Sequence, residues 1–320
     1  MTGLWSRLIS RMAGNHACDP LLSAAVERSV YRVEPRLKQI RGFPGRYRPF
    51  IEPVLARVRQ LATSVPGPVT VDTENYIRDP FVHALFGSPE DIRRFLCSTQ
   101  TMRDHVARHG AGELYALLSM RRTERTVFGM EATGEVLRRD VAQQTVSFSD
   151  HQLIGLAPTE AEARENLLWY LFDRYMDHVA GGLDLLRAEQ QRLVQQKDLA
   201  LARLRGVSAG PRVVRQKELD KVLAQLAEAT ASLDLERLVD VFEVVLSHPE
   251  DCLALKAHSL AVDAMGVIQA DAGNHGGARL DFVDLLERDR EPRSVVLVHC
   301  RQVLAILPAE RLQEAKQWLG

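Results

Sequence analysis

Residues 158–205 read PTEAEARENLLWYLFDRYMDHVAGGLDLLRAEQQRLVQQKDLALARLR, and this stretch decides the fold. Thr159 is a favourable helix N-cap, and Glu162, three residues later, completes a capping box. No proline follows before Arg205, so we predict one long helix over this range, with a kink at Gly181-Gly182 as an open alternative. The first half of the helix is apolar nearly all round, which indicates burial in a globular body.

The second half of this helix carries a narrower apolar stripe. Its members alternate four and three residues apart, a spacing typical of a heptad repeat. Gln190 and Lys197 are the polar exceptions. The stripe consists of Val179, Leu183, Leu186, Gln190, Leu193, Lys197, Ala200 and Leu204.

A Gly/Pro turn over residues 206–211 separates this helix from a second stretch with the same spacing, namely Leu219, Leu223, Leu226, Thr230 and Leu233. A single helix with so narrow a stripe is marginal in water, so the two arms need each other. We therefore predict an antiparallel coiled-coil helical hairpin over residues 159–233 with its tip at 206–211. Internal packing of the hairpin and pairing with a second copy remain two alternatives.

The remaining chain predicts three further regions and an α+β, mainly helical fold. Residues 1–110 are expected to be helical, with start signals at Asp19-Pro20 and Ser88-Pro89. Residues 111–158 favour a central β-meander of three or four strands. Residues 234–320 favour an α+β region that opens with a helix near 235–245. It then forms a small mixed or antiparallel sheet from segments 253–258, 260–265, 279–283 and 294–298.

Composition narrows the class of protein. The chain has 320 residues, 46% hydrophobic and 26% charged, with a net charge of −1. The chain as a whole is therefore not an electrostatic nucleic-acid binder. No segment approaches the length of a membrane span, and four scattered cysteines predict reduced thiols and a cytoplasmic location. Residues 1–12 form an amphipathic pattern that suits either the protein's own core or a membrane surface.

Charge is distributed unevenly along the chain. Residues 1–59 contain eleven Arg or Lys and four Asp or Glu, whereas residues 232–291 contain thirteen Asp or Glu and five Arg or Lys. The two segments either pair with each other or steer a charged partner to one end of the molecule.

The search for chemistry predicts no catalytic, cofactor-binding or metal-ligating residue. The G-x-x-x-x-G spacing at 129–134 is followed by Glu135, where a phosphate loop needs Lys. His105 and His109 are four apart, but no third ligand is marked. The Gly-rich loop at 273–277 combines flexible backbone with His275, so an enzyme of unknown class centred there is retained as an alternative.

Basic side chains supply the candidate binding residues. One cluster flanks the hairpin tip and the other is interleaved with aromatic residues near the N-terminus; together they comprise Arg203, Arg205, Arg212, Arg215, Lys217, Arg46, Arg48 and Tyr47. Cations at the tip suit protein contacts or nucleic acid, and they equally suit a solvated helix end whose C-terminal carbonyls they neutralise.

The sequence thus predicts a non-enzymatic cytoplasmic interaction or scaffold protein that uses the hairpin as a docking arm for a protein partner or for itself. A nucleic-acid-associated protein that uses the basic N-terminal region and the tip is the main alternative.

Overall fold

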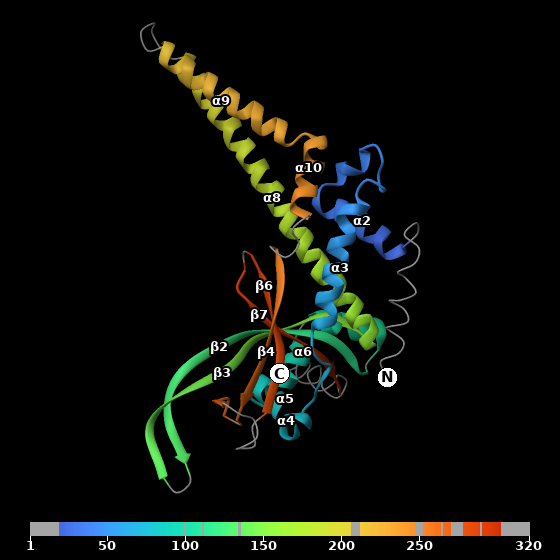
Figure 1. Ribbon diagram of the computed structural model, residues 1–320, viewed down its shortest axis with the longest axis vertical. Coiled ribbons are helices and arrows are strands. Elements are labelled where there is room, and N and C mark those ends of the chain that lie inside the picture. Colours follow the sequence, from blue (N-terminus) through green and yellow to red (C-terminus); the bar gives the residue numbers. More distant parts are fainter. Residues whose placement is uncertain are drawn as a thin grey trace, which may run out of the picture. The chain divides into compact units, whose positions relative to one another are not determined.

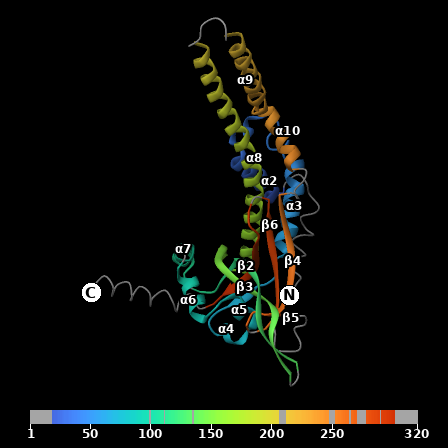
Figure 2. The ribbon, with the colours of Figure 1, turned by 90° about the vertical axis from the view of Figure 1, so that its left-hand side faces the viewer.

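The computed structural model describes residues 19–98, 100–110, 112–133, 136–205, 212–246, 252–263, 265–269, 278–288 and 290–301 (Figures 1 and 2). The chain divides into two compact units. The first unit combines Met1–Val58 with Phe172–Cys252, and the second combines Arg59–Leu171 with Leu253–Gly320. Each unit joins two stretches that are distant in sequence, whereas the sequence suggested four consecutive regions.

The described part of the first unit is helical. It contains α2 (Pro20–Val33), the 3₁₀ helix η1 (Pro35–Gln39), part of α3 (Arg48–Ser64), part of α8 (Glu160–Arg205), α9 (Arg212–Ser232) and α10 (Leu235–Leu246). Asp19 caps α2 by accepting a hydrogen bond from the Leu21 N–H at 2.9 Å. Thr159 Oγ1 accepts from the Glu162 N–H at 3.3 Å, so α8 begins at the predicted capping box.

The prediction of one long helix is confirmed, because α8 runs without interruption for 46 residues and ends at Arg205. Figures 1 and 2 both draw α9 alongside the second half of α8. Gln190 Nε2 donates to Thr230 Oγ1 at 3.2 Å, and Arg215 Nη1 donates to the Arg203 carbonyl at 2.9 Å. Contacts therefore move toward the tip on α8 as they move toward the start of α9, as antiparallel helices require. Coiled-coil packing of the two helices remains a prediction.

Ion pairs join α2 to α8 in the first unit. The Arg28 guanidinium bonds both Asp173 carboxylate oxygens, at 2.5 and 2.7 Å, and Arg32 binds Asp177 in the same two-pronged way at 2.5 and 2.9 Å. Ala25, Val26 and Val30 of α2 are inaccessible to solvent. The charged pairs fix which side of α2 meets α8.

A buried carboxylate, Glu34, joins two elements of the same unit at the base of the hairpin. Glu34 is only 4% exposed and binds Arg36 through two hydrogen bonds, at 3.0 and 2.9 Å. Arg187 on α8 donates to the same carboxylate. The hydrogen bonds from Arg36 outweigh desolvation and hold the pKa of Glu34 at about 2. Glu34 therefore ties η1 to the base of the hairpin.

The described part of the second unit contains one seven-stranded sheet. The strands are β1 (Val69–Val71), β2 (Leu114–Thr133), β3 (Val136–Ala157), β4 (Leu253–Val262), β5 (Ile268–Gln269), β6 (Ala278–Glu287) and β7 (Arg293–Cys300). Their order is β3-β2-β7-β6-β4-β5, and all neighbours are antiparallel, while β1 pairs with β7 in parallel.

This sheet corrects two predictions. The expected meander of three or four strands is a two-stranded hairpin of 20- and 22-residue strands, and it belongs to the same sheet as the C-terminal strands. The turn predicted at 148–151 is a register shift opposite Ser119 and Arg121, where Asp150 adopts a positive φ of 50°. Segment 253–258 and the start of segment 260–265 likewise form one strand, β4, which ends at Val262. Turn-forming residues inside a long ribbon mark a bulge rather than a chain reversal.

One face of the sheet is covered by short helices. These are α4 (Asn75–Arg78), α5 (Pro80–Leu85), α6 (Pro89–Ser98) and α7 (Gln100–His109). The last two replace the single helix that the sequence predicted up to His109. Side chains of α5 and α6, including Val82, Leu85 and Ile92, join Leu118 and Val296 of the sheet in one apolar cluster. The core of the second unit thus lies between these helices and the sheet.

The segment just before β5, at one edge of the sheet, contacts β3 at the other edge. The Val146 N–H donates to the Gly266 carbonyl at 2.8 Å, and Thr145 forms a bridge with Val267. Gly266 has a φ of +77°, and a Cβ there would lie 2.8 Å from the Val146 carbonyl oxygen. Glycine is therefore required where the two edges meet.

The Glu34 contacts predict a pH-dependent stability. Its folded pKa of about 2 lies below the usual 4.5, so its contribution is complete above about pH 4.5 and is lost as the pH falls toward 2. We expect Glu34→Gln to lower the free energy of unfolding by about 2 kcal/mol at pH 7 and to flatten its decline below pH 5. Urea unfolding followed by circular dichroism at pH 7 and at low pH measures both effects.

Glu27→Gln is the matched control, because Glu27 is 61% exposed and makes only a surface pair with Lys38. Its loss should change stability by less than about 0.5 kcal/mol. Equal effects of the two substitutions would contradict the assigned role of Glu34.

Candidate interaction site on the helical hairpin

The stripe predicted on α8 faces away from solvent. Val179, Leu183 and Leu193 are buried, and the other five members of the stripe are all partly buried. Gln190, a polar exception, donates its hydrogen bond to Thr230 of α9. The periodicity of the sequence therefore identifies the side of α8 that meets α9.

On α9 the shielded stripe differs by one residue from the predicted one. Leu219, Leu226 and Leu233 lie in it as expected, but Val222 and Ala229 occupy the positions that we predicted for Leu223 and Thr230. Leu223 is 43% exposed. Both choices keep a four-and-three spacing, so periodicity alone does not separate them. Leucine, the more apolar residue, lies outside the seam and is available for another contact.

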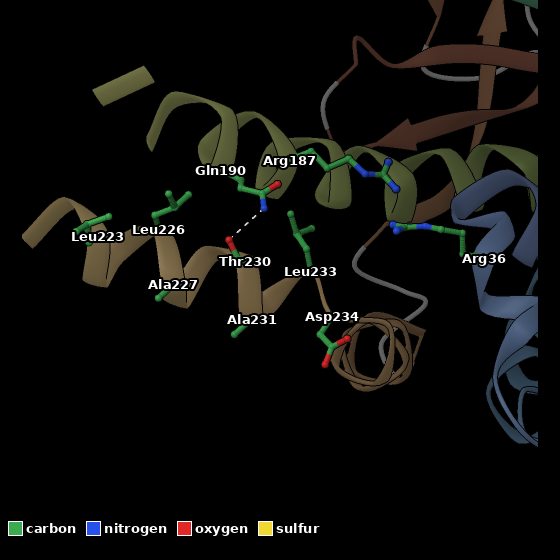
Figure 3. Close-up of a pocket in the computed structure, with 10 residues that line it drawn as sticks. All are labelled: Arg36, Arg187, Gln190, Leu223, Leu226, Ala227, Thr230, Ala231, Leu233 and Asp234. Carbon is green, nitrogen blue, oxygen red and sulfur yellow. Dashed lines mark hydrogen bonds between the residues drawn. The ribbon is translucent and has the colours of Figure 1, made fainter. Parts of the chain in front are cut away.

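An open groove of about 850 Å³ runs along the base of the hairpin (Figure 3). Helix α9 supplies five of its ten lining residues, and Arg187 and Gln190 contribute from α8. The lining residues are Arg36, Arg187, Gln190, Leu223, Leu226, Ala227, Thr230, Ala231, Leu233 and Asp234. The middle of the groove is therefore apolar, and charged groups lie at its end near η1.

The two flanks of the hairpin differ in polarity. We define the seam as the two shielded stripes of α8 and α9. We define the groove flank as the residues that directly follow the seam positions Leu186, Leu193, Ala200, Val222 and Ala229, namely Arg187, Val194, Leu201, Leu223 and Thr230. Arg187, Leu223 and Thr230 line the same groove, which places this flank of both helices on one side. Val194 and Leu201 follow Arg187 by one and two heptads and continue its line.

The opposite side forms the polar flank, which we define as the residues directly before the seam positions Gln190, Lys197, Leu204, Leu219, Leu226 and Leu233, namely Glu189, Gln196, Arg203, Glu218, Gln225 and Ser232. Glu189 pairs with Arg192 through hydrogen bonds of 2.7 and 2.5 Å. All six side chains of this flank are polar or charged. The groove flank instead leaves apolar side chains in solvent, with Val194 exposed by 37%.

The tip cations separate into two groups. Arg215 donates to the Arg203 carbonyl in the last turn of α8, which matches the expectation that a cation neutralises this helix end. Arg203, Arg205, Arg212 and Lys217 are exposed. The described helix ends on either side of the tip therefore expose basic side chains.

The second basic cluster does not form a binding surface as a whole. Tyr47 is inaccessible to solvent, donates its hydroxyl hydrogen to the Leu37 carbonyl at 2.9 Å and packs edge-on against Phe242. Arg46 pairs with Glu236 at 3.0 Å, and Arg48 donates to Ser23 Oγ at 3.4 Å. The aromatic residue expected to contact a partner is thus a core residue, because burial of its ring outweighs exposure of its polar tip.

The basic N-terminal stretch pairs mostly with carboxylates outside the acidic segment 232–291. Arg46 to Glu236 joins the basic N-terminal stretch to the acidic segment 232–291. The bidentate pairs of Arg28 and Arg32 are instead made to Asp173 and Asp177 on α8. Sequence counts located the cations but not the carboxylates that bind them.

Sequence reasoning missed a buried polar cluster in the second unit. Asp284 on β6 is 5% exposed; it accepts hydrogen bonds from Arg122 on β2 at 2.6 Å and from Ser294 on β7 at 2.7 Å. His258 Nε2 lies 2.8 Å from the same carboxylate, but the ring N–H is not aimed along a hydrogen bond. The sequence shows these polar residues within otherwise apolar strands, but only the pairing of the strands reveals that they lie together. The hydrogen bonds that Asp284 accepts from Arg122 and Ser294 indicate a structural role for this carboxylate.

The remaining candidates for chemistry find little support. His105 and His109 stack with ring centroids 4.7 Å apart, and burial lowers the pKa of His105. Among the residues that the structure describes, no group of three or more His, Cys, Asp or Glu is placed to hold a metal ion. Residues 273–277 and the amphipathic stretch 1–12 lie outside the described residues. Cys252 and Cys300 are buried free thiols, as expected.

Within the described ranges, no helix combines the length and the apolar character needed to cross a bilayer. Comparisons of this chain with protein-family models, with curated proteins and with solved structures find no match.

Proposed function

We propose that this chain is a non-enzymatic, cytoplasmic interaction protein that uses the α8–α9 hairpin as a docking arm, with the two helices packed as an antiparallel coiled coil. The observation that carries the proposal is the groove at the hairpin base together with the exposed apolar side chains of the groove flank. A hairpin needed only for internal packing would gain nothing from leucine and valine at these solvent-facing positions.

The polarity of the opposite flank supports the same proposal. A helix pair that is solvated on all sides keeps polar residues beside its seam, as the polar flank does. The groove flank departs from this rule on both helices at once, at Val194 and Leu223. Leu185 and Leu199 are also exposed, but they line no described groove. Arg192 lies one heptad from each of them, so a charged residue interrupts the apolar line that they would form. Single exposed leucines of that kind are common on protein surfaces.

The coiled-coil part of the proposal predicts different effects for adjacent residues. In dilute protein, Val222→Lys should destabilise the hairpin by about 1–2 kcal/mol, because it places a charge in the seam. Leu223→Lys should leave the hairpin intact, because its side chain already reaches solvent. Amide hydrogen exchange of residues 190–230 reports the difference. If the amide hydrogens exchange faster in Leu223→Lys than in Val222→Lys, Leu223 rather than Val222 lies in the seam, as the sequence predicted.

The docking role predicts that partner capture depends on the groove flank. Tagged full-length protein, Leu223→Lys and Leu199→Lys are compared as baits in native lysate after nuclease treatment. We expect proteins, including further copies of this chain, to be recovered by the wild-type and Leu199→Lys baits and lost from Leu223→Lys. The control leucine lies on the same hairpin and is 59% exposed, so general surface charge is matched.

A fourth bait replaces residues 190–229 with a short Gly/Ser turn and must first be shown to be folded. Identical protein recovery by all four baits would overturn the docking role. Recovery of nucleic acid alone, released by about 0.5 M salt when nuclease is omitted, would instead assign function to the basic tip and the N-terminal region.

A further inference from the structure

We infer that the occupant of the groove flank is a second copy of this chain, which packs its own groove flank in the opposite direction to form an antiparallel four-helix arrangement. This inference rests on the proposed docking role of the hairpin and names its partner. It begins with the groove flank, on which Val194 and Leu223 expose apolar side chains; Leu223 also lines the groove at the base of the hairpin, and the opposite, polar flank carries charged and amide side chains.

The groove flank is suited to self-contact because Val194 and Leu223 are apolar, whereas charged side chains lie at the base of the hairpin on one side of them and beside the tip on the other. In a twofold interface each residue on the axis meets its own copy, so the axis must pass through uncharged side chains. An axis through Val194 and Leu223 satisfies this condition, since valine meets valine and leucine meets leucine. Leu201 and Leu226 lie beside the axis and extend the apolar contact.

Charge along the hairpin then selects the direction of the second copy. The tip segments 203–205 and 212–221 contain six Arg or Lys and two Asp or Glu. The base segments 184–192 and 228–234 contain four Asp or Glu and two Arg. A parallel pair would place two basic tips together and two acidic bases together. The antiparallel pair places each basic tip against the acidic base of its partner.

Residue positions agree with this arrangement. When Leu223 lies on the axis, Arg212 of one protomer comes opposite Asp234 of its partner, since the two residues lie equally far from Leu223 on either side. Asp234 lines the groove, and Arg212 is exposed at the start of α9. Arg205, at the end of α8, similarly approaches the turn that contains Asp184. Each pair occurs twice by symmetry.

The charges at the base also disfavour a generic acidic helix as occupant. Arg36 and Arg187 line the groove, but both bind Glu34, and Arg187 also binds Asp184 at 2.9 Å. Asp234 adds a further carboxylate at that end. An acidic ligand would therefore meet cations already neutralised by carboxylates. A partner with cations at one end and carboxylates at the other is required, and the hairpin itself has this distribution.

The test is the association state of the full-length chain, measured by sedimentation velocity over a range of protein concentrations. We expect the wild-type protein to form a dimer. Leu223→Lys should raise the dimer dissociation constant at least about tenfold, because two lysines would meet at the axis. Leu199→Lys, the matched exposed leucine off the groove, should leave the constant within about twofold. Far-UV circular dichroism confirms that each variant is folded.

A covalent readout covers the case in which Leu223→Lys does not fold. Leu223→Cys should form an intermolecular disulfide under mild oxidation, since two copies meet at the axis, whereas Leu199→Cys should not. A monomeric wild-type protein at about 100 μM, equal dissociation constants for the two lysine variants, or a dimer that never links through position 223 would overturn the inference. If the protein is monomeric but the Leu223→Lys bait loses a foreign protein, the docking role survives and only its partner changes.

Discussion

The hairpin depends on one constraint: neither arm has enough apolar surface to be a stable helix alone, so each must bury its single stripe against the other. Helix α9 illustrates this limit, with Leu219 as its one fully buried side chain among those whose burial is described. The seam therefore fixes which side of each helix is hidden, and through it every other position on the arm. Which residues lie on each flank follows from which residues form the seam.

Polar contacts place this seam in register and hold its base. An apolar stripe alone tolerates sliding by a heptad, because leucine meets leucine in either position. The hydrogen bond from Gln190 to Thr230 lacks its partner in any other register. Glu34 fixes a different contact at the base, since its buried carboxylate binds both Arg36 of η1 and Arg187 of α8. Polar groups thus supply the specificity that the apolar seam lacks.

The sequence was informative wherever periodicity or capping chemistry acts locally. The start of α8 at Thr159, its end at Arg205 and the shielded stripe between them all follow from local pattern. Long-range pairing was not accessible in the same way. One seven-stranded sheet unites β2 and β3 with strands more than a hundred residues later, and the Asp284 cluster forms only because of that pairing. The fate of Tyr47 was missed for a similar reason, as its partner Phe242 lies far along the chain.

The displacement of Leu223 from the seam connects fold to function most directly. A seam that carried Leu223 and Thr230 would bury a hydroxyl and leave Val222 and Ala229 on the flank, where they would offer little to a partner. The observed register buries the smaller apolar residues, which lets the helices approach closely, and turns the leucine outward into the groove. A single choice of helix rotation therefore both satisfies the contact between the two helices and exposes the leucine that the proposed contact between copies uses. Because both helices turn apolar side chains toward the same side, the arm has one apolar flank and one polar flank, and under the proposed self-association this asymmetry favours a closed pair over an open polymer.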